Sequence, residues 1–378
     1  MQVVNGTNLD MNATESIDKD GRAWLVVVVK GTYDIPADAS AAPLLSATQR
    51  GLLYTDVFEG EVGLSAPLLE NDLVPVKSMC DVIVKGSAHA PQGKPVTEVT
   101  ASLAVGPIKK SIRVVGNRRW TKRGSRYEPS GPEPFVKLPI SYSRASGAMF
   151  NHASINSNDP RDFLVHPENF VGCGYARGKF LRLIEGSPVP NLEWPNAPIS
   201  DPEDLVRPAS FGPLSRGWAP RASCAGTYDD KWRDEVFPLL PSDFDERYYQ
   251  SAPADQQMPF PTGGEEVRLL NMQPGGGLTL FRLPDLHLGV LVLSRRRART
   301  LLKTVVDTIV IDADSNTFDL VWRGRLPLAY GLSEIHTVVS GRVCKRWWES
   351  VLYGQPDCGC GGVETNDTDL VPVTEVLA

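Results

Sequence analysis

Short runs of β-branched residues, separated by Gly, Pro and Asn, dominate the hydrophobic pattern of this chain. The clearest group lies between Asp81 and Trp120, where three apolar runs are separated by two turn-forming sequences, Pro91–Pro95 and Gly106-Pro107. Runs of this composition, bounded by such residues, are typical of antiparallel strands. Residues 81–120 therefore predict three strands joined by two turns.

The first 20 residues are polar and predict a loose end, and a continuous β-branched run, Trp24–Lys30, follows them. This run is short enough for a single strand that is buried on both faces. Residues 27–36, VVVKGTYDIP, are echoed by residues 82–91, VIVKGSAHAP. The echo is compatible with two similar β units and equally with chance repetition, because one echo does not establish a repeat array.

The segment 145–265 has a different character, because Asn, Pro, Gly and Asp dominate and the hydrophobic periodicity is lost. It contains three large aromatic side chains, Trp194, Phe211 and Trp218. Such rings need a surface to bury against, so we expect long ordered loops packed on a β core. Apolar residues with helical spacing predict a helix at Asp229–Leu239, and a second short helix is predicted at Asp243–Tyr249.

Strand-like runs return from Glu266 onward. Thr304–Asp312 and Thr317–Arg323 flank a four-residue turn, which predicts a β-hairpin. A closing helix is predicted at Val343–Leu352. Residues 354–378 contain five acidic residues but no Lys, Arg or aromatic residue, and we expect most of this tail to be disordered.

These patterns predict a mainly β protein, with an antiparallel, sandwich-like β core, long Pro- and Gly-rich loops and one or two short helices. The composition agrees, because 33 Gly and 31 Pro residues are spread through the 378-residue chain and indicate many turns. The expected regions are an N-terminal β region (1–144), a loop-rich segment packed on the core (145–265), a C-terminal β region (266–353) and the acidic tail (354–378).

We expect a cytoplasmic protein that makes no membrane contact. The N-terminus lacks the basic and apolar regions of a secretory signal, and the apolar run Ala23–Val29 is too short to span a bilayer. Six Cys residues are scattered along the chain without the dense spacing of a disulfide framework. Only Cys358 and Cys360 are close, and their one-residue separation is poor for a zinc-binding pair, so their role stays open.

Catalytic and cofactor-binding motifs are missing from the sequence. We find no zinc-protease motif, no nucleophile elbow and no phosphate-binding loop. The five His residues are far apart, and none of them has the spacing of helical metal ligands: His89, His152, His166, His287 and His336. We predict no enzyme activity, cofactor or metal, because a hydrolase site would have to be assembled from distant His and Asp residues.

One charge cluster bears on function. Between Lys109 and Arg126 there are eight basic residues and no acid, with Trp120 among them and Tyr127 adjacent. Such a segment could bind nucleic acid through phosphate charge and base stacking, although the whole chain carries a net charge of −6. An acidic protein partner, or the chain's own acidic segment 229–246, is an alternative counterpart. We interpret that acidic segment as a solvated helix face.

The same blocks resemble a known family. VIVKGSAHAP, VGPIKK and VVGNRRW are similar, in this order, to blocks of a bacterial accessory family of the type VI secretion system, catalogued as domain of unknown function twenty-one sixty-nine. GRAWLVVVVKGTYDIP, PASFGPLSRGWAPR and DTIVIDADSNTFDLVWRGRLPL resemble further blocks of it. The resemblance covers roughly residues 20–330.

The resemblance implies an adaptor or chaperone that binds a type VI secretion effector, or the PAAR-containing spike-tip part of it, and helps to load it onto the secreted spike. It implies no enzyme activity and no cofactor. Trp and Arg are favoured at interface hot spots, and exposed strand edges can receive a partner strand. The candidate protein-binding residues are therefore Trp194, Phe211, Arg216, Trp218 and Arg221 in the loop-rich segment, and Arg118, Arg119 and Trp120 after the third strand. Nucleic-acid binding through Lys109–Arg126 is the alternative.

Overall fold

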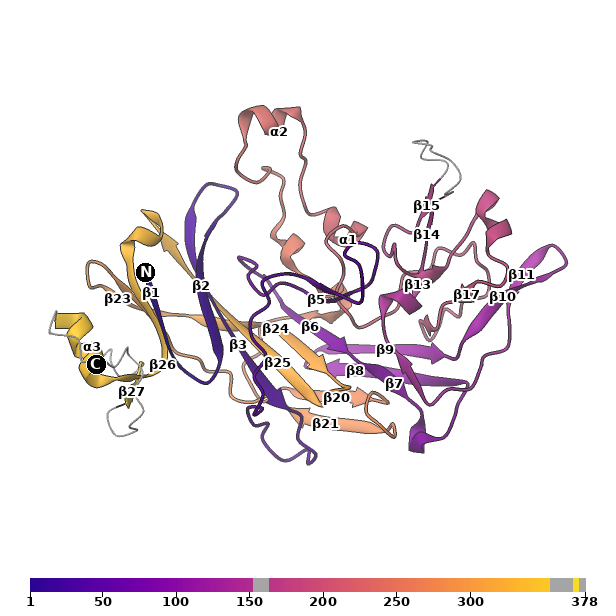
Figure 1. Cartoon of the computed structure of the whole chain (residues 1–378), viewed down its shortest axis with the longest axis horizontal. Coiled ribbons are helices and arrows are strands. Elements are labelled where there is room, and N and C mark those ends of the chain that lie inside the picture. The colour runs from indigo at the N-terminus through magenta and orange to yellow at the C-terminus, as the bar shows by residue number, and fades with distance from the viewer. Residues whose placement is uncertain (152–162, 354–369, 374–378) are drawn as a thin grey trace.

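The computed structural model describes residues 1–151, 163–353 and 370–373, and it confirms a mainly β fold with mostly antiparallel sheets. Two sheets face each other at the centre of the molecule, and a third lies at the end that holds both termini (Figure 1). Loops and short elements occupy the opposite end.

The central sheet has six strands in the order β19-β6-β24-β25-β3-β2, and only β6 and β24 pair in parallel. Its strands are β2 (Asp10–Ile17), β3 (Ala23–Asp34), β6 (Cys80–Lys85), β19 (Gln257–Met258), β24 (Thr304–Asp312) and β25 (Thr317–Leu328). The β24–β25 hairpin confirms the predicted turn, since Asp312 pairs with Thr317. Val26, Val27 and Val28 are all buried, which confirms that β3 is covered on both faces.

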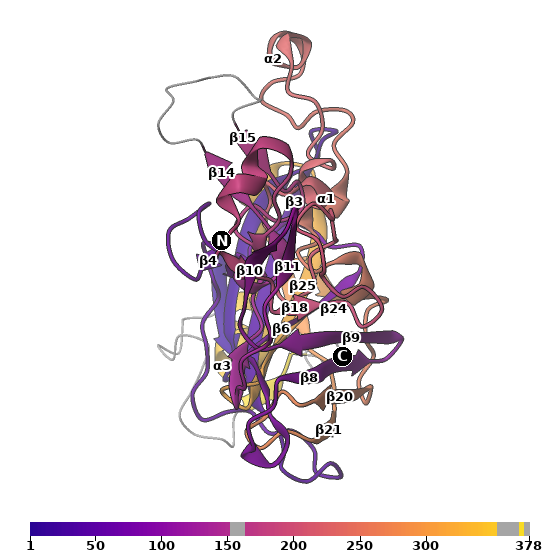
Figure 2. The ribbon, with the colours of Figure 1, turned by 90° about the vertical axis from the view of Figure 1, so that its right-hand side faces the viewer.

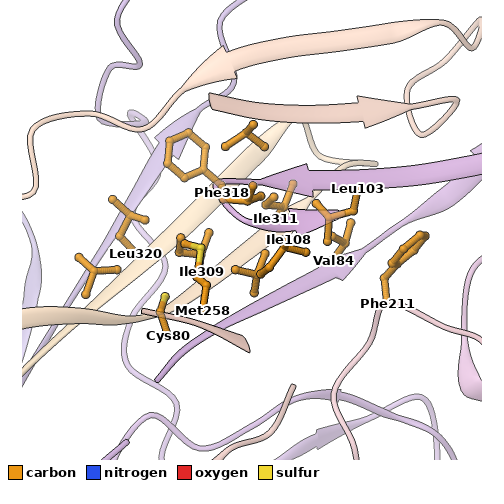
Figure 3. Packing of buried hydrophobic residues seen from close by; sticks show 14 of the residues in the cluster. Cys80, Val84, Leu103, Ile108, Phe211, Met258, Ile309, Ile311, Phe318 and Leu320 are labelled. Atoms are coloured by element: carbon orange, nitrogen blue, oxygen red, sulfur yellow. The ribbon is translucent and has the colours of Figure 1, made fainter. Parts of the chain in front are cut away.

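The second sheet has five antiparallel strands in the order β18-β9-β8-β20-β21. Its strands are β8 (Glu98–Val105), β9 (Ile108–Val115), β18 (Leu192–Glu193), β20 (Glu266–Leu270) and β21 (Leu278–Arg282). Leu103 and Ile108 of this sheet meet Val84 and Ile311 of the central sheet in one core (Figure 3). The strands predicted within residues 81–120 thus lie on both sides of the sandwich.

The third sheet joins the two ends of the chain. It contains β1 (Gln2–Gly6), β22 (Val290–Ser294), β23 (Arg299–Leu302), β26 (Ile335–Cys344) and β27 (Leu370–Pro372). The prediction of a loose N-terminus is wrong, because β1 pairs in parallel with β26 and β2 pairs with β3. The closing helix is confirmed as α3 (Lys345–Tyr353), which buries Trp347 and Trp348. In the predicted tail, β27 pairs with β26, and the remainder lies outside the described residues.

Short elements complete the fold. β10 (Arg118–Arg123) and β11 (Arg126–Pro129) form a hairpin, and β17 (Pro188–Val189) pairs with the other edge of β10. Small pairs are formed by β4 (Val57–Phe58) with β5 (Pro67–Leu69), β7 (Ser87–His89) with β12 (Lys137–Pro139), β13 (Ser146–Gly147) with β16 (Cys173–Gly174), and β14 (Met149–Asn151) with β15 (Phe163–Val165). The helical pieces are α1 (Ala219–Ala222), α2 (Asp230–Glu235) and the 3-10 turns η1 (Pro91–Gly93), η2 (Tyr142–Arg144), η4 (Gly178–Leu183), η5 (Glu246–Tyr249), η6 (Ala254–Gln256) and η7 (Gly331–Glu334).

Candidate partner-binding surface

The two aromatic candidates Phe211 and Trp218 lie inside the protein. Phe211 is 0% exposed, and its backbone carbonyl accepts hydrogen bonds from Val84 N at 3.0 Å and Gln256 Nε2 at 2.9 Å. Trp218 is 2% exposed and stacks edge-on against Tyr142, with ring centroids 5.0 Å apart. Both rings anchor loops to the β core, so the expectation that they contact a partner is corrected.

Two further candidates, Arg216 and Arg221, brace the interior. Arg221 is buried; its Nη2 lies 2.5 Å from Glu70 Oε1, and its Nε donates to the carbonyl of Tyr248 at 3.0 Å. The half-buried Arg216 reaches the same Glu70 oxygen at 3.2 Å. Because Glu70 is itself nearly inaccessible, these guanidiniums compensate an internal charge.

Trp194 keeps part of its surface accessible. Its Nε1 donates to the carbonyl of Arg207 at 2.9 Å. The Arg207 guanidinium and the Lys110 ammonium lie 5.3 and 5.4 Å from the ring centroid, which is the geometry of cation–π contacts. Trp194 is thus a partly exposed ring beside two cations, both of which also pair with Asp255 Oδ1.

The basic cluster is divided by burial. Arg118 is buried and its Nη2 lies 2.5 Å from Glu193 Oε1, whereas Arg119 is exposed and donates from Nη1 to the carbonyl of Gly186 at 2.7 Å. Trp120 is fully buried and donates from Nε1 to Gly174 O, so it is not available to stack on a base or on a partner.

The acids that balance this cluster come from elsewhere than residues 229–246. Arg113 pairs with both Glu98 and Glu193, and the buried Lys110 lies 3.1 Å from Asp255 Oδ1. Burial lowers the pKa of Lys110 to about 8, although Asp255 opposes the shift. The suggestion that the segment 229–246 neutralises the cluster is therefore corrected.

A projecting arm, residues 223–245 between α1 and η5, carries α2 away from the sheets (Figure 1), and the perpendicular view shows the same projection (Figure 2). Local bonds shape it. Asp229 caps α2 by accepting a hydrogen bond from Trp232 N at 2.8 Å, and Trp232 Nε1 donates to the carbonyl of Leu239 at 3.0 Å. The predicted helix is confirmed as this shorter element.

The arm is fixed at its base. The Lys19 ammonium, in the turn between β2 and β3, donates to the carbonyls of Ser242 and Phe244 at 3.3 and 3.2 Å. Asp243 accepts hydrogen bonds from the backbone N–H and the hydroxyl of Thr227, and these bonds lower the pKa of Asp243. The two sides of the arm are thus tied together where it leaves the body.

Three aromatic residues at the end of the arm form what we call the aromatic tip: Tyr228, Trp232 and Phe237. The ring of Trp232 makes edge-on contacts with Tyr228 at 4.7 Å and with Phe237 at 5.8 Å between centroids. Tyr228 is 53% and Phe237 67% exposed. Sequence reasoning missed this group because it treated the helix as a solvated face. The available signal was one aromatic residue within a short acidic helix and one on each side of it.

The sequence around the aromatic tip carries more acidic than basic side chains. Residues 229–246 hold seven acids and two bases, and Arg233 is paired locally with Asp230 at 2.7 Å and Asp234 at 2.9 Å. The arm therefore presents exposed aromatic surface within a negative field, which suits a basic protein surface with an apolar depression.

The described residues were compared with the pattern of a metal site. No group of three or more His, Cys, Asp or Glu there could hold a metal ion. The described His side chains have separate partners, such as Asp314 for His89 and the carbonyl of Val206 for His166. His152 lies outside the described residues. No helix of the described residues is long and apolar enough to cross a membrane.

Comparison with known proteins gives one match. No curated protein and no solved structure matches the chain. Residues 20–323 match the model of a family described as uncharacterized protein conserved in bacteria (DUF2169). The match includes the second sheet, the central sheet without β2 and the last residues of β25, the loop-rich segment and the arm. Because it covers most of the sequence, the chain belongs to the DUF2169 family of bacterial proteins.

Proposed function

We propose that this protein is an adaptor or chaperone that binds a type VI secretion effector, or the PAAR-containing spike-tip part of it, and helps to load it onto the secreted spike. Membership of the DUF2169 family supports the proposal through the association with type VI secretion that the sequence resemblance implies. The protein acts by binding, in the cytoplasm, without cofactor or enzymatic step.

The observation that carries the proposal is the aromatic tip. Large exposed aromatic rings grouped on a projecting element mark protein–protein contact sites, because their burial supplies much of the binding energy. Tyr228 and Phe237 are exposed, whereas Phe281, Phe318 and Trp322 of the two facing sheets are buried. The hydrogen bonds of Asp229, Trp232 and Lys19 hold the arm in shape, so little ordering entropy is lost when a partner binds.

The acidic surroundings of the tip favour a partner with a basic contact surface. Opposite charges around an apolar centre steer association and make it sensitive to salt.

A second function, nucleic-acid binding, keeps some support, because Lys122, Arg123 and Arg126 are exposed on the β10–β11 hairpin and suit phosphate contacts. A salt-sensitive gel shift with single-stranded DNA or RNA tests that alternative.

The test of the adaptor function is coexpression with the effector encoded by a neighbouring gene, followed by copurification. The wild-type chain is expected to form a complex and to raise the amount of soluble effector. The double variant Tyr228→Ser/Phe237→Ser is expected to weaken the complex at least 30-fold, since hot-spot aromatics contribute about 2 kcal/mol or more each. Tyr330→Ser is the matched control, because Tyr330 is 75% exposed on a different element.

The outcomes separate the parts of the proposal. No complex and no gain in soluble effector with the wild-type chain would end the adaptor function. A complex that survives the double variant unchanged would retain the adaptor function and remove the aromatic tip as its contact site. Equal loss with Tyr330→Ser would point to a general effect of surface apolarity rather than to the arm.

A further inference from the structure

A cavity of about 450 Å³ opens where the β10–β11 hairpin leaves the body of the protein. Its walls come from the start of β10, from β17, and from segments near η2 and β16. Most of the described residues that line it are polar, and the six that matter here are Asn117, Arg118, Arg119, Glu133, Arg144 and Cys173. The volume lies within the range of about 300–1,000 Å³ that is usual for small-ligand sites.

Three guanidinium groups dominate the cavity wall. Arg118 is neutralised by Glu193 at 2.5 Å, and its Nη2 also donates to the carbonyl of Pro190 at 2.6 Å. Arg119 and Arg144 differ, because each donates to a neutral oxygen: Gly186 O at 2.7 Å and Asn191 Oδ1 at 3.1 Å. Neither of these two arginines forms an ion pair within the described ranges, and each has five N–H donors, so most of their donors stay available.

The other titratable groups of the cavity leave this positive charge largely unopposed. Burial raises the pKa of the Cys173 thiol to about 12, although Arg144 and Arg118 oppose the shift, so the thiol is neutral at pH 7. Glu133 is the acid among the described lining residues. It is held near the cavity because its backbone N–H donates to Asn117 O at 3.0 Å and its carbonyl lies against Gly116, where a side chain would collide with it.

We propose that this cavity binds a carboxylate-bearing ligand, with Arg119 and Arg144 as its main contacts. Guanidinium groups match carboxylates in shape and charge and bind them through paired, charge-assisted hydrogen bonds. Glu133 disfavours a compact phosphate, whose whole charge sits on one small group, more than a polycarboxylate, whose charges are spread over separate carboxylates that need not all face Glu133. Glu133 Oε2 accepts a hydrogen bond from Asn117 Nδ2 at 3.4 Å, and the other oxygen, Oε1, suits an N–H or O–H donor on the same ligand. This site does not rest on the adaptor function.

The carboxylate has two possible sources, a small polycarboxylic acid or an acidic peptide segment. The experiment measures binding of citrate, of a pentaglutamate peptide and of inorganic phosphate to the full chain by titration calorimetry. We expect citrate or the peptide to bind and phosphate to bind more weakly. Binding of citrate alone supports the small acid, and binding of the peptide alone supports the acidic segment. Binding of both supports a carboxylate subsite that either can reach.

Variants then locate the binding. Arg119→Gln and the double variant Arg119→Gln/Arg144→Gln are expected to lower the affinity for the probe that binds by at least tenfold. Arg126→Gln, which removes an exposed arginine of the same hairpin outside the cavity, is expected to leave it unchanged. Because Arg119 is exposed, its single variant should fold normally even if the double variant does not.

Three results would overturn the assignment. Absence of binding by both carboxylate probes would remove the site. Phosphate binding as tightly as the better carboxylate would remove its selectivity. An equal loss with Arg126→Gln would show that the probe follows the general positive charge of the hairpin and not the cavity.

Discussion

The carboxylate of Asp81, at the start of β6, provides a sharp test of how the loop-rich segment is attached to the core. It is fully buried and its Oδ2 lies 2.7 Å from the ammonium of Lys77. Gln250 Nε2 donates to Oδ1 at 2.7 Å, and Ser251 donates to Oδ2 from its backbone N–H at 2.7 Å and its hydroxyl at 3.1 Å. The Asp81 carboxylate therefore joins the central sheet to the end of η5 by hydrogen bonds, and it balances the charge of Lys77.

The perturbation is Asp81→Asn, which removes the charge and keeps the volume. Burial alone would lower the pKa of Lys77, but Asp81, Glu70 and Asp307 together raise it, so the ammonium stays charged. Loss of the Asp81 charge leaves this buried cation without its close partner, since Glu70 is 4.0 Å away. Breaking a buried pair in this way costs about 3–5 kcal/mol of unfolding free energy.

Lys77→Met should cost less, because Asp81 keeps its donors from Gln250 and Ser251. In the Asp81→Asn background the same substitution should restore part of the loss, since it removes the uncompensated cation. We expect a favourable coupling energy of about 2 kcal/mol between the two sites. Lys109→Met, at an exposed position of β9, is the control and should change stability by less than about 0.5 kcal/mol.

The assay is urea unfolding at pH 7, followed by tryptophan fluorescence, for the wild type, both single variants and the double variant. The reasoning is refuted if Asp81→Asn costs less than about 1 kcal/mol, because an uncompensated buried charge cannot be that inexpensive. It is also refuted if Lys77→Met destabilises the Asp81→Asn variant as much as it destabilises the wild type.

Two further predictions concern burial. Phe211→Ala should lower the free energy of unfolding by about 3–5 kcal/mol, because Phe211 is buried. Phe237→Ala should change it by less than about 0.5 kcal/mol, because Phe237 is exposed. Equal urea midpoints for the two variants would contradict this difference in burial. For Lys110, the folded-state pKa falls from 10.5 to about 8, so between these values the unfolded chain binds more protons and stability rises with pH. The stability of Lys110→Met relative to wild type should therefore fall by up to about 3 kcal/mol from pH ~8 to pH ~10.5, and parallel pH profiles would contradict this.

The central strands could be predicted because their own residues are apolar enough to indicate burial. β3 and β24 are apolar over most of their length, so no tertiary information is needed to recognise them. β1 and β2 escape the same reasoning. β2 lies at the edge of its sheet and is largely half-exposed, so its sequence, DMNATESI, is polar. Edge strands of this kind are specified by pairing with a neighbour, which the local pattern does not contain.

Several cations of the candidate site and of the basic cluster lie inside the protein, and the sequence did not reveal this for a related reason. Arg118, Arg221 and Lys110 look like surface cations in the sequence, because their acidic partners are 75, 151 and 145 residues away. A buried charge is tolerable only with such a partner, and sequence spacing gives no sign of one at this distance. The Arg and Lys residues correctly indicated strong charge interactions. Residue type alone does not tell whether the acidic partner lies in this chain or on another molecule.

The same ambiguity applies to the aromatic residues, and the structure resolves it by a physical criterion. Trp218 and Trp232 both lie in the loop-rich segment 145–265, yet Trp218 packs against the core ring of Tyr142, whereas the ring contacts of Trp232 are with Tyr228 and Phe237 of its own arm. A ring that packs in the core contributes to the free energy of folding. Tyr228 and Phe237 gain little from folding, because more than half of each surface stays in water. Their remaining apolar surface stays accessible, which is the physical reason that the proposed contact site is the arm and does not include the buried rings of Phe211 and Trp218.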